Sequence, residues 1–291
     1  MVSVNEKVET GEKMKVALCL HGLVGNTKSG PSYEHGTSRD ESDLDDKKLC
    51  AELAFKDWKK YIIEENDVDV FIHSWDLGVE DYLVESYQPK KYQIEKQIIF
   101  KPEDKEDNPR NRAVYSKFYG TKRVMELKQE YEKENDFKYD CVIESRFDMA
   151  WNRPVKFSDY DMSYLYNVEL IKDGTWFGYP RNTHLKGTIE RKEVMDWWFF
   201  SNSEFMDRFS LLYDHIGRYN KTIYQWKGMS PHFLIYAYLE EIGAIPDLLR
   251  TGLKGASPNS TEWLDDDYCN VIRRAYFNEN IRPGKQGEVL L

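Results

Sequence analysis

Three short apolar runs, each ending in polar or glycine residues, constrain the fold of this chain more than any other feature. They are residues 15–24 (KVALCLHGLV), 68–75 (VDVFIHSW) and 139–147 (YDCVIESRF). Such runs are typical of strands that are buried on both faces of a sheet. Residues 49–65 and 113–134, which lie between them, carry apolar side chains at helical spacing. This alternation predicts βαβ units, and therefore an α/β fold with a mostly parallel central sheet flanked by helices.

The 291 residues fit a single domain of this class, preceded by a short leader. Residues 1–13 are polar and charged without apolar periodicity, so we expect them to be flexible. We expect one domain over residues 14–291, with the regular βαβ pattern in 14–151 and a less regular half in 152–291. The charged segment 101–112 is expected to be a loop. The pattern after residue 151 predicts strands at 162–168 and 194–200 and helices at 204–216 and 231–242.

The composition excludes several classes of protein. A hydrophobic share of 41% and an aromatic share of 14% are too high for a disordered chain, and a net charge of −10 opposes general binding to nucleic acids. The four cysteines lack the CxxC spacing of zinc sites. No basic segment leads into an apolar stretch at the N-terminus, and no apolar run reaches the length of a membrane span. We therefore expect a cytoplasmic protein.

The third apolar run ends in the most informative sequence of the chain. Glu144-Ser145-Arg146-Phe147-Asp148 places an acid, a guanidinium and a carboxylate where a predicted parallel strand leaves the sheet. Ligands of parallel sheets gather at the carboxyl ends of the strands. Arg146 could neutralise a phosphate, and Asp148 could hold a divalent metal ion or a sugar hydroxyl. The alternative is an ordinary ion pair at the end of a strand, which is common in proteins.

A family resemblance is carried by four segments: FIHSWD (71–76), YSKFYGTKR (115–123), YDCVIESRFD (139–148) and DWWFFSNSEFMDRFSLLYD (196–214). Together they resemble glycosyltransferase-like proteins of large DNA viruses, phages and bacterial surface-polysaccharide loci. The resemblance implies a single GT-A-like, Rossmann-like domain. It also implies that the first half binds a nucleotide-diphosphate sugar and that the second half lies on the side of a glycan acceptor.

The sequence departs from this family at one informative position. Metal-dependent GT-A enzymes usually carry Asp-x-Asp, whereas this chain has Arg146-Phe147-Asp148. Asp148 is then the candidate ligand for a divalent cation, Mn²⁺ or Mg²⁺, and Arg146 could do part of the cation's work. Other Asp-x-Asp matches, at residues 67–69, 159–161 and 265–267, are weaker candidates because they do not end a predicted strand.

The loops after the first two predicted strands supply further candidates for donor binding. Gly22, Gly25 and Lys28 follow the first strand, and Asp76 follows the second. The first loop nearly matches the P-loop pattern, but Thr27 stands where that pattern requires its second glycine. We therefore reject a Walker-type site and keep a looser role, in which backbone amides and Lys28 lie near a nucleotide.

The long predicted helix offers three more donor candidates. Ser116, Tyr119 and Lys122 recur at a spacing of three residues, so they share one face of the helix. Two hydroxyls and one charge on that face could contact a nucleotide. An exposed helical face without function is the alternative.

Sugar transfer to a hydroxyl requires a catalytic base beside the acceptor, and the second half of the chain offers Asp196, Asp214 and His232. Asp196 is the first choice, because it precedes the aromatic run 197–200 and aromatic faces stack on sugar rings. His232 is the second choice, and Asp148 is a further catalytic candidate. The alternatives are that the aromatic run is packed core and that His232 is a capping or core residue.

The sequence therefore predicts an enzyme, a glycosyltransferase that moves a sugar from a nucleotide-diphosphate sugar to a glycan hydroxyl. Surface or capsid glycan synthesis is the expected setting, in the host cytoplasm if the protein is viral. Two alternatives stay open. One is a nucleotide-dependent sulfo- or phosphotransferase that uses residues 25–29 as a phosphate loop, and the other is a non-catalytic glycan-binding protein. A hydrolase is disfavoured, because residues 228–232 (GMSPH) fail the GxSxG pattern in their last position.

Overall fold

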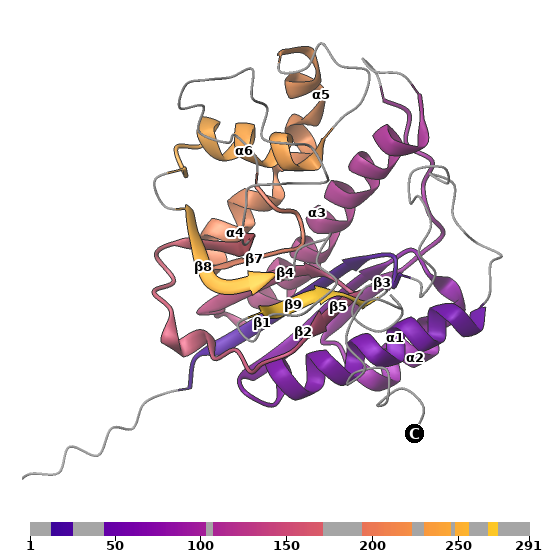
Figure 1. The fold of residues 1–291 in the computed structure, drawn as a ribbon, viewed down its shortest axis with the longest axis vertical. Helices are drawn as coiled ribbons and strands as arrows, with labels where there is room; N and C mark the ends of the chain where they lie inside the picture. Colours follow the sequence, from indigo (N-terminus) through magenta and orange to yellow (C-terminus); the bar gives the residue numbers. More distant parts are fainter. Residues whose placement is uncertain are drawn as a thin grey trace, which may run out of the picture.

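The computed structural model describes residues 13–25, 44–102, 107–170, 194–222, 230–245, 248–255 and 267–272. These residues form three layers, in which helices cover both faces of one sheet (Figure 1). The chain is thus a mixed α/β protein with a mostly parallel central sheet, as the alternation of strands and helices predicts. The arrangement is compatible with a Rossmann-like fold.

The described residues contain nine strands, which belong to one sheet. They are β1 (Lys15–Gly22), β2 (Asp67–Ser74), β3 (Lys91–Ile94), β4 (Cys141–Arg146), β5 (Met149–Trp151), β6 (Leu165–Leu170), β7 (Trp198–Ser201), β8 (Leu248–Gly255) and β9 (Asp267–Val271). Their spatial order is β3-β2-β1-β4-β7-β6-β8-β9-β5. Neighbours are parallel from β3 to β4 and from β6 to β9. Antiparallel pairs join β7 to β4 and β6, and β5 to β9.

The helices lie between these strands in the chain. They are α1 (Leu44–Trp58), α2 (Glu80–Tyr87), α3 (Pro109–Asn135), α4 (Ser203–Ser210), α5 (Leu212–Thr222) and α6 (Pro231–Glu241). A π-helical turn, Lys59–Ile63, continues α1, and two short 3-10 turns occupy Leu77–Val79 and Phe157–Asp159. No helix in the described segments is long and apolar enough to cross a membrane.

Alternate side chains of the central strands face opposite helix layers. Val16, Leu18 and Leu20 of β1 pack in one buried cluster with side chains of α1 and α2. Ala17 and Cys19 pack in a second cluster with α3, α4, α5 and α6. Figure 1 shows the same division, with α1 and α2 on one side of the sheet and α3 on the other. The continuous apolar character of β1 therefore follows from burial on both of its faces.

The long helix α3 has clear start and stop signals. Asn108 is the N-cap, and its side chain accepts a hydrogen bond from the backbone N–H of Asn111 at 2.9 Å. Pro109 occupies the first helical position, where no N–H partner is needed. The helix ends at Asn135, and its C-cap, Asp136, adopts the left-handed conformation with φ of 51°.

A buried lysine ties α3 to α4. Lys128 is fully buried, and its ammonium group donates to Glu132 at 3.1 Å, to Ser203 at 2.7 Å and to Asp207 at 2.5 Å. A buried charge is tolerated only when such partners satisfy it. This contact fixes the C-terminal half of α3 against the second half of the chain.

Several element boundaries differ from the sequence-based prediction. Helix α3 begins at Pro109, inside the predicted loop 101–112, because Asn108 and Pro109 form a helix start. The strand predicted at 194–200 is β7, which begins only after Trp197. The helix predicted at 204–216 is two helices that meet at Leu211. Strands β3, β5, β8 and β9 were not predicted, because they are short or interrupted by charged residues and glycine.

Two expectations about chain organisation are not decided. Residues 1–12 of the expected leader lie outside the described residues. The division of the domain into halves at residue 151 stays a prediction. The sheet itself continues across that division, since β4 pairs with β7.

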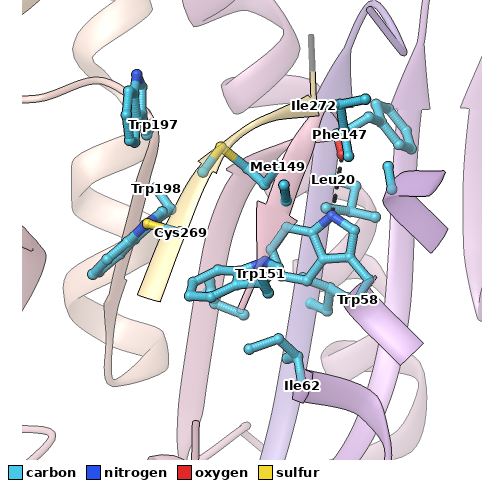
Figure 2. Packing of buried hydrophobic residues seen from close by; sticks show 14 of the residues in the cluster. Leu20, Trp58, Ile62, Phe147, Met149, Trp151, Trp197, Trp198, Cys269 and Ile272 are labelled. Atoms are coloured by element: carbon cyan, nitrogen blue, oxygen red, sulfur yellow. Dashed lines mark hydrogen bonds between the residues drawn. The ribbon is translucent and has the colours of Figure 1, made fainter. Parts of the chain in front are cut away.

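The core on the α1 side is centred on Trp58, beneath the end of β4. Trp58 is fully buried and meets Trp151 edge-on, with ring centroids 5.2 Å apart. Its Nε1 donates to the carbonyl oxygen of Phe147 at 3.1 Å, as Figure 2 shows. Phe147 stands between Arg146 and Asp148, so this hydrogen bond holds the strand end that carries both charged residues.

We expect Trp58→Ala to lower the free energy of unfolding by about 3–5 kcal/mol, because it leaves a large cavity and an unpaired carbonyl. Trp58→Phe keeps most of the ring and loses the hydrogen bond, so about 1–3 kcal/mol is expected. Urea unfolding measures both values. Ile99→Ala, at a side chain that is 62% exposed, is the control and should change stability by less than about 0.5 kcal/mol. A Trp58→Ala effect as small as the control would contradict this account.

Candidate active site

The order of the central strands defines where a ligand would bind. From β1 the chain moves through β2 to β3 on one side, and it then returns to place β4 on the other side of β1. In open α/β sheets, ligands bind outside the carboxyl ends of the strands where the order reverses in this way. Gly22 aligns with Ser74 and His21 with Arg146, so β1, β2 and β4 end at the same edge. The predicted site residues after β1 and β4 therefore flank the reversal.

Arg146 and Asp148 form a bidentate ion pair at the end of β4. Arg146 Nε donates to Asp148 Oδ1 at 2.5 Å, and Nη2 donates to Oδ2 at 2.8 Å. The side chain of Asp148 is 5% exposed, whereas that of Arg146 is 32% exposed. Both carboxylate oxygens are thus engaged, while the third nitrogen of the guanidinium, Nη1, takes no part in the pair.

The loop after β1 packs directly on this ion pair. Gly25 has a φ of +94°, and a Cβ atom at this position would lie 2.7 Å from Asp148 Cβ and 3.1 Å from Cys50 Sγ. Only glycine satisfies both the backbone conformation and the lack of space. Gly25 therefore fixes how closely the first loop approaches Asp148.

Asp76, at the end of β2, braces the same loop. Its Oδ2 accepts from the backbone N–H of Val24 at 2.8 Å, and its Oδ1 accepts from Lys47 Nζ at 2.7 Å. The side chain is 1% exposed. The structure thus gives Asp76 a supporting role for the loop, and direct donor binding by Asp76 stays a prediction.

A row of buried polar side chains lies under α3, beside this edge. His21 Nε2 is 2.5 Å from Glu144 Oε1, and Thr121 Oγ1 of α3 donates to the same oxygen at 2.9 Å. His73, aligned with His21 on the neighbouring strand, has its Nε2 3.2 Å from Glu95 Oε1. Glu144, on the same strand as Arg146, is thereby tied to both β1 and α3.

Gly120 of α3 allows the helix to approach these histidines. A Cβ atom at Gly120 would lie 3.1 Å from His21 Nδ1 and 3.3 Å from His73 Nδ1. Both Nδ1 atoms are buried and have no hydrogen-bond partner among the described residues. The row is therefore tightly enclosed between the sheet and the helix.

Burial sets the charge of this row. It lowers the pKa of His21, and it lowers the pKa of His73 to about 4, against the opposing effect of the Glu95 hydrogen bond. Burial alone would raise the pKa of Glu144, but His21, Lys117 and the hydrogen bond from Thr121 together lower the pKa of this carboxyl. Near neutral pH the two histidines are therefore neutral, and Glu144 is ionised.

The two predicted bases, Asp196 and His232, lie next to each other. Asp196 Oδ1 is 3.8 Å from His232 Nδ1, which is also 3.0 Å from the carbonyl oxygen of Val194. Burial would raise the pKa of Asp196, but His232, Lys117 and Arg146 together lower it. Asp196 is therefore an ionised carboxylate within the electrostatic reach of Arg146. The structure thus brings the candidate base and the end of β4 to one cluster.

The three candidate side chains on α3 contact neighbouring residues. Ser116 is buried and accepts from Gln97 Nε2 at 3.2 Å. Tyr119 stacks on Trp75, with ring centroids 5.5 Å apart. Lys122 Nζ donates to Asp214 of α5 at 2.7 Å. Ser116 is thus buried, whereas Tyr119 and Lys122 are half-buried against neighbouring side chains, and donor binding by this face stays a prediction. Lys28 lies outside the described residues.

The aromatic run after Asp196 is core. Trp197, Trp198, Phe199 and Phe200 are each at most 4% exposed. Trp198 Nε1 is directed to Cys269 Sγ at 3.4 Å, and Phe199 packs on Phe209. The expectation that these rings stack on a sugar is therefore not supported by their packing, and the alternative of packed core holds.

Some residues of the cluster were not found from the sequence. Lys117, Thr121 and His21 join it only because α3 crosses β1 and β2 at Gly120, and this crossing is set by tertiary packing. Glu144 carried a signal, because a charged residue in an otherwise apolar strand needs a buried partner. Its partner His21 could be assigned only once the register of β1 and β4 was known.

The described residues do not form a complete metal site. No group of three or more His, Cys, Asp or Glu side chains converges among them, and both oxygens of Asp148 accept from Arg146. The expected Mn²⁺ or Mg²⁺ at Asp148 therefore stays a prediction.

This chain matches no protein-family model and no curated protein. The features of the chain that bear on its function are therefore its fold, the position of the cluster at the reversal of strand order, and the charges of the cluster.

We expect Gly25→Ala to lower the free energy of unfolding more than Gly22→Ala does. Both glycines have positive φ, +94° and +91°, so alanine is strained by about 1–2 kcal/mol at either position. Only at Gly25 does the added methyl group also collide with Asp148, for a further cost of about 1–3 kcal/mol. Urea unfolding of the two variants isolates this contact. Equal losses in the two variants would show that Gly25 does not pack on Asp148.

We also expect stability to fall as the pH is lowered from about 6.5 towards 4. Burial lowers the pKa of His21 and His73 in the folded state, so the unfolded chain binds more protons in this window. Each histidine then contributes a slope of up to about 1.4 kcal/mol per pH unit. Urea unfolding across this range measures the slope. His73→Gln should flatten it, and an unchanged slope in that variant would contradict the assignment for His73.

Proposed function

We propose that this chain is a glycosyltransferase of GT-A-like type that uses a nucleotide-diphosphate sugar. The observation that carries the proposal is the cluster at the reversal of strand order, where Gly25 packs on the Arg146–Asp148 pair and Asp196 lies within reach of Arg146. Reversal points of this kind are where α/β proteins bind nucleotides. The resemblance of four sequence segments to glycosyltransferase-like proteins supports the same conclusion.

On the donor side, Gly22 and Gly25 turn the backbone close to the end of β4. A Cβ atom at Gly22 would have nothing within 4 Å, so a phosphate could approach the main chain there, whereas Gly25 is in contact with Asp148. Arg146, whose side chain is 32% exposed, supplies a guanidinium group at the end of β4. Asp148 orients Arg146 and is the group that we assign to a donor hydroxyl or a cation.

The charge of the cluster bears on how a diphosphate would bind. Two cations, Lys117 and Arg146, face three carboxylates, Glu144, Asp148 and Asp196, so the cluster carries one net negative charge before any charge on His232 is counted. A diphosphate needs additional positive charge in such a place. A divalent cation, Mn²⁺ or Mg²⁺, would supply it when bound, and Asp148 is the residue expected to hold it.

On the acceptor side, we assign Asp196 as the base. It is ionised and partly exposed, at 16% of its side chain, so it can accept a proton from an incoming hydroxyl. The hydroxyl oxygen forms a bond to the anomeric carbon while the bond from that carbon to the diphosphate breaks. The proton passes to Asp196, and the nucleoside diphosphate leaves with the electron pair. His232 holds its position beside Asp196 and is the second candidate for this role.

The two rival functions receive less support from the described residues. A sulfo- or phosphotransferase would use residues 25–29 as a phosphate cradle, but Gly25, which the structure describes, packs so closely on Asp148 that it leaves no space for a phosphate. A glycan-binding protein would use exposed aromatic rings, whereas the run 197–200 is buried.

Lys28→Ala distinguishes a sulfo- or phosphotransferase from a glycosyltransferase. This change should abolish activity in a transferase with a phosphate loop and have a mild effect in a glycosyltransferase. The proposed setting is surface or capsid glycan synthesis in the cytoplasm.

We expect Asp148→Asn to lower the rate of sugar transfer or donor hydrolysis by about 10²–10³-fold, because the amide can neither orient Arg146 with two charged contacts nor hold a cation. Release of nucleoside diphosphate from a nucleotide-sugar measures the rate, and a thermal melt shows that the variant is folded. Asp81→Asn, at an exposed position of α2, is the matched control. Wild-type turnover in Asp148→Asn would remove Asp148 from the site.

Calorimetric titration with a panel of nucleoside diphosphates and their sugars, each with and without Mn²⁺, tests the proposal itself. At least one diphosphate should bind, and Mn²⁺ should strengthen binding if Asp148 holds the ion. If no member of the panel binds under either condition, the chain is not an enzyme of this class.

A further inference from the structure

Lys117 of α3 lies within the cluster, although the sequence alone gives it no role there. Its Nζ donates to the backbone carbonyl oxygen of Asp196 at 2.7 Å and lies 4.0 Å from Asp196 Oδ2. The side chain is 16% exposed, as is that of Asp196. The same ammonium group acts electrostatically on His21 and Glu144. Lys117 thus touches the candidate base from the helix side.

The segment that carries Asp196 is held from the sheet side as well. The backbone N–H of Arg146 and the hydroxyl of Ser145 both approach the carbonyl oxygen of Trp197, at 3.4 Å and 3.3 Å. Lys117 holds the preceding carbonyl, that of Asp196. Two consecutive carbonyl groups are therefore fixed from opposite sides, by β4 and by α3.

The turn of α3 that carries Lys117 is itself fixed. Thr121, one helical turn later, donates to the buried carboxylate of Glu144 at 2.9 Å, and Glu144 is bound to His21 of β1. Gly120, between them, lets the helix lie close to the strands. The backbone that carries Lys117 therefore cannot shift without breaking a buried contact. Because this backbone is fixed, the Lys117 side chain can hold Asp196 in one position.

We infer that Lys117 is a positioning residue for Asp196, which it holds in place through the main chain and keeps in its charged form through the ammonium group. This inference rests on the proposed role of Asp196 as the base. It adds to that role a reason why this particular carboxylate can be both fixed and ionised beside Arg146.

Two effects follow for catalysis if Lys117 acts in this way. Loss of the ammonium group removes one of the cations that lower the pKa of Asp196, so a larger fraction of the base is protonated at a given pH. Loss of the hydrogen bond also frees the carbonyl of Asp196 and allows the base to move. Misplacement of a catalytic group by about 1 Å can cost about 10²-fold in rate. The effect should fall on kcat more than on KM, because Lys117 acts through Asp196.

The test uses Lys117→Met, which keeps the apolar stem, and Lys117→Arg, which keeps the charge. Lys122→Met is the matched control, since Lys122 lies on the same helix and pairs with Asp214. The carboxyl carbon of Asp196, assigned with Asp196→Asn, is titrated by NMR in protein labelled with ¹³C-aspartate. This readout does not depend on turnover.

We expect the pKa of Asp196 to rise in Lys117→Met and to stay near the wild-type value in Lys117→Arg and Lys122→Met. An unchanged titration in Lys117→Met, or an equal shift in Lys122→Met, overturns the inference. If Lys117→Met does not fold, Lys117→Gln is compared with Lys117→Arg by the same criterion. Where a donor is turned over, kcat of Lys117→Met should fall about 10²-fold with partial recovery in Lys117→Arg.

Failure of the two ideas can be told apart. If no nucleotide-sugar binds but Asp196 shifts only in Lys117→Met, the proposed function fails while the link between Lys117 and Asp196 stands. If a nucleotide-sugar is turned over and the titration of Asp196 does not respond to Lys117, the function stands and this inference fails.

Discussion

The buried contact among Glu144, His21 and Thr121 is the constraint on which the arrangement of the site depends. An ionised carboxylate inside a protein needs hydrogen-bond donors, and Oε1 of Glu144 has one partner on β1 and another on α3. Because Glu144 is itself on β4, three elements meet at one oxygen. Such a contact contributes little net stability compared with apolar packing, but it allows only one relative placement of helix and strands. The polar row and Lys117 take their positions from that placement.

Two glycines allow the first loop and α3 to lie close to the side chains of the site. Gly25 brings the first loop onto Asp148, and Gly120 brings α3 onto the two buried histidines. In both places a methyl group would occupy space that a functional side chain already fills. The charged cluster is therefore compact, with cations and carboxylates alternating over short distances. In so small a region each group alters the pKa of its neighbours, as the lowered pKa of Asp196 illustrates.

The fold was predictable from the sequence to a large extent, because β1, β2 and β4 are buried on both faces and therefore carry continuous apolar runs. Strand ends could be located for the same reason, and with them Arg146 and Asp148. Side-chain partners could not be located. Ser116, Tyr119 and Lys122 do share one side of α3, but the sequence does not say which side packs on the sheet and which is covered by α5. The aromatic run 197–200 was ambiguous because rings suit both a core and a sugar platform.

The pairing of β4 with β7 has a mechanical consequence. Arg146 is the last residue of β4, and Asp196 lies two residues before β7, so the groups assigned to donor and acceptor are attached to neighbouring strands of a single ladder. A hydrogen-bonded ladder resists shear and bending far more than a linker between two domains does. In the proposed reaction, the pairing of these strands would hold the separation between the leaving group and the base nearly constant. An acceptor would then be selected by whether its hydroxyl reaches across that gap.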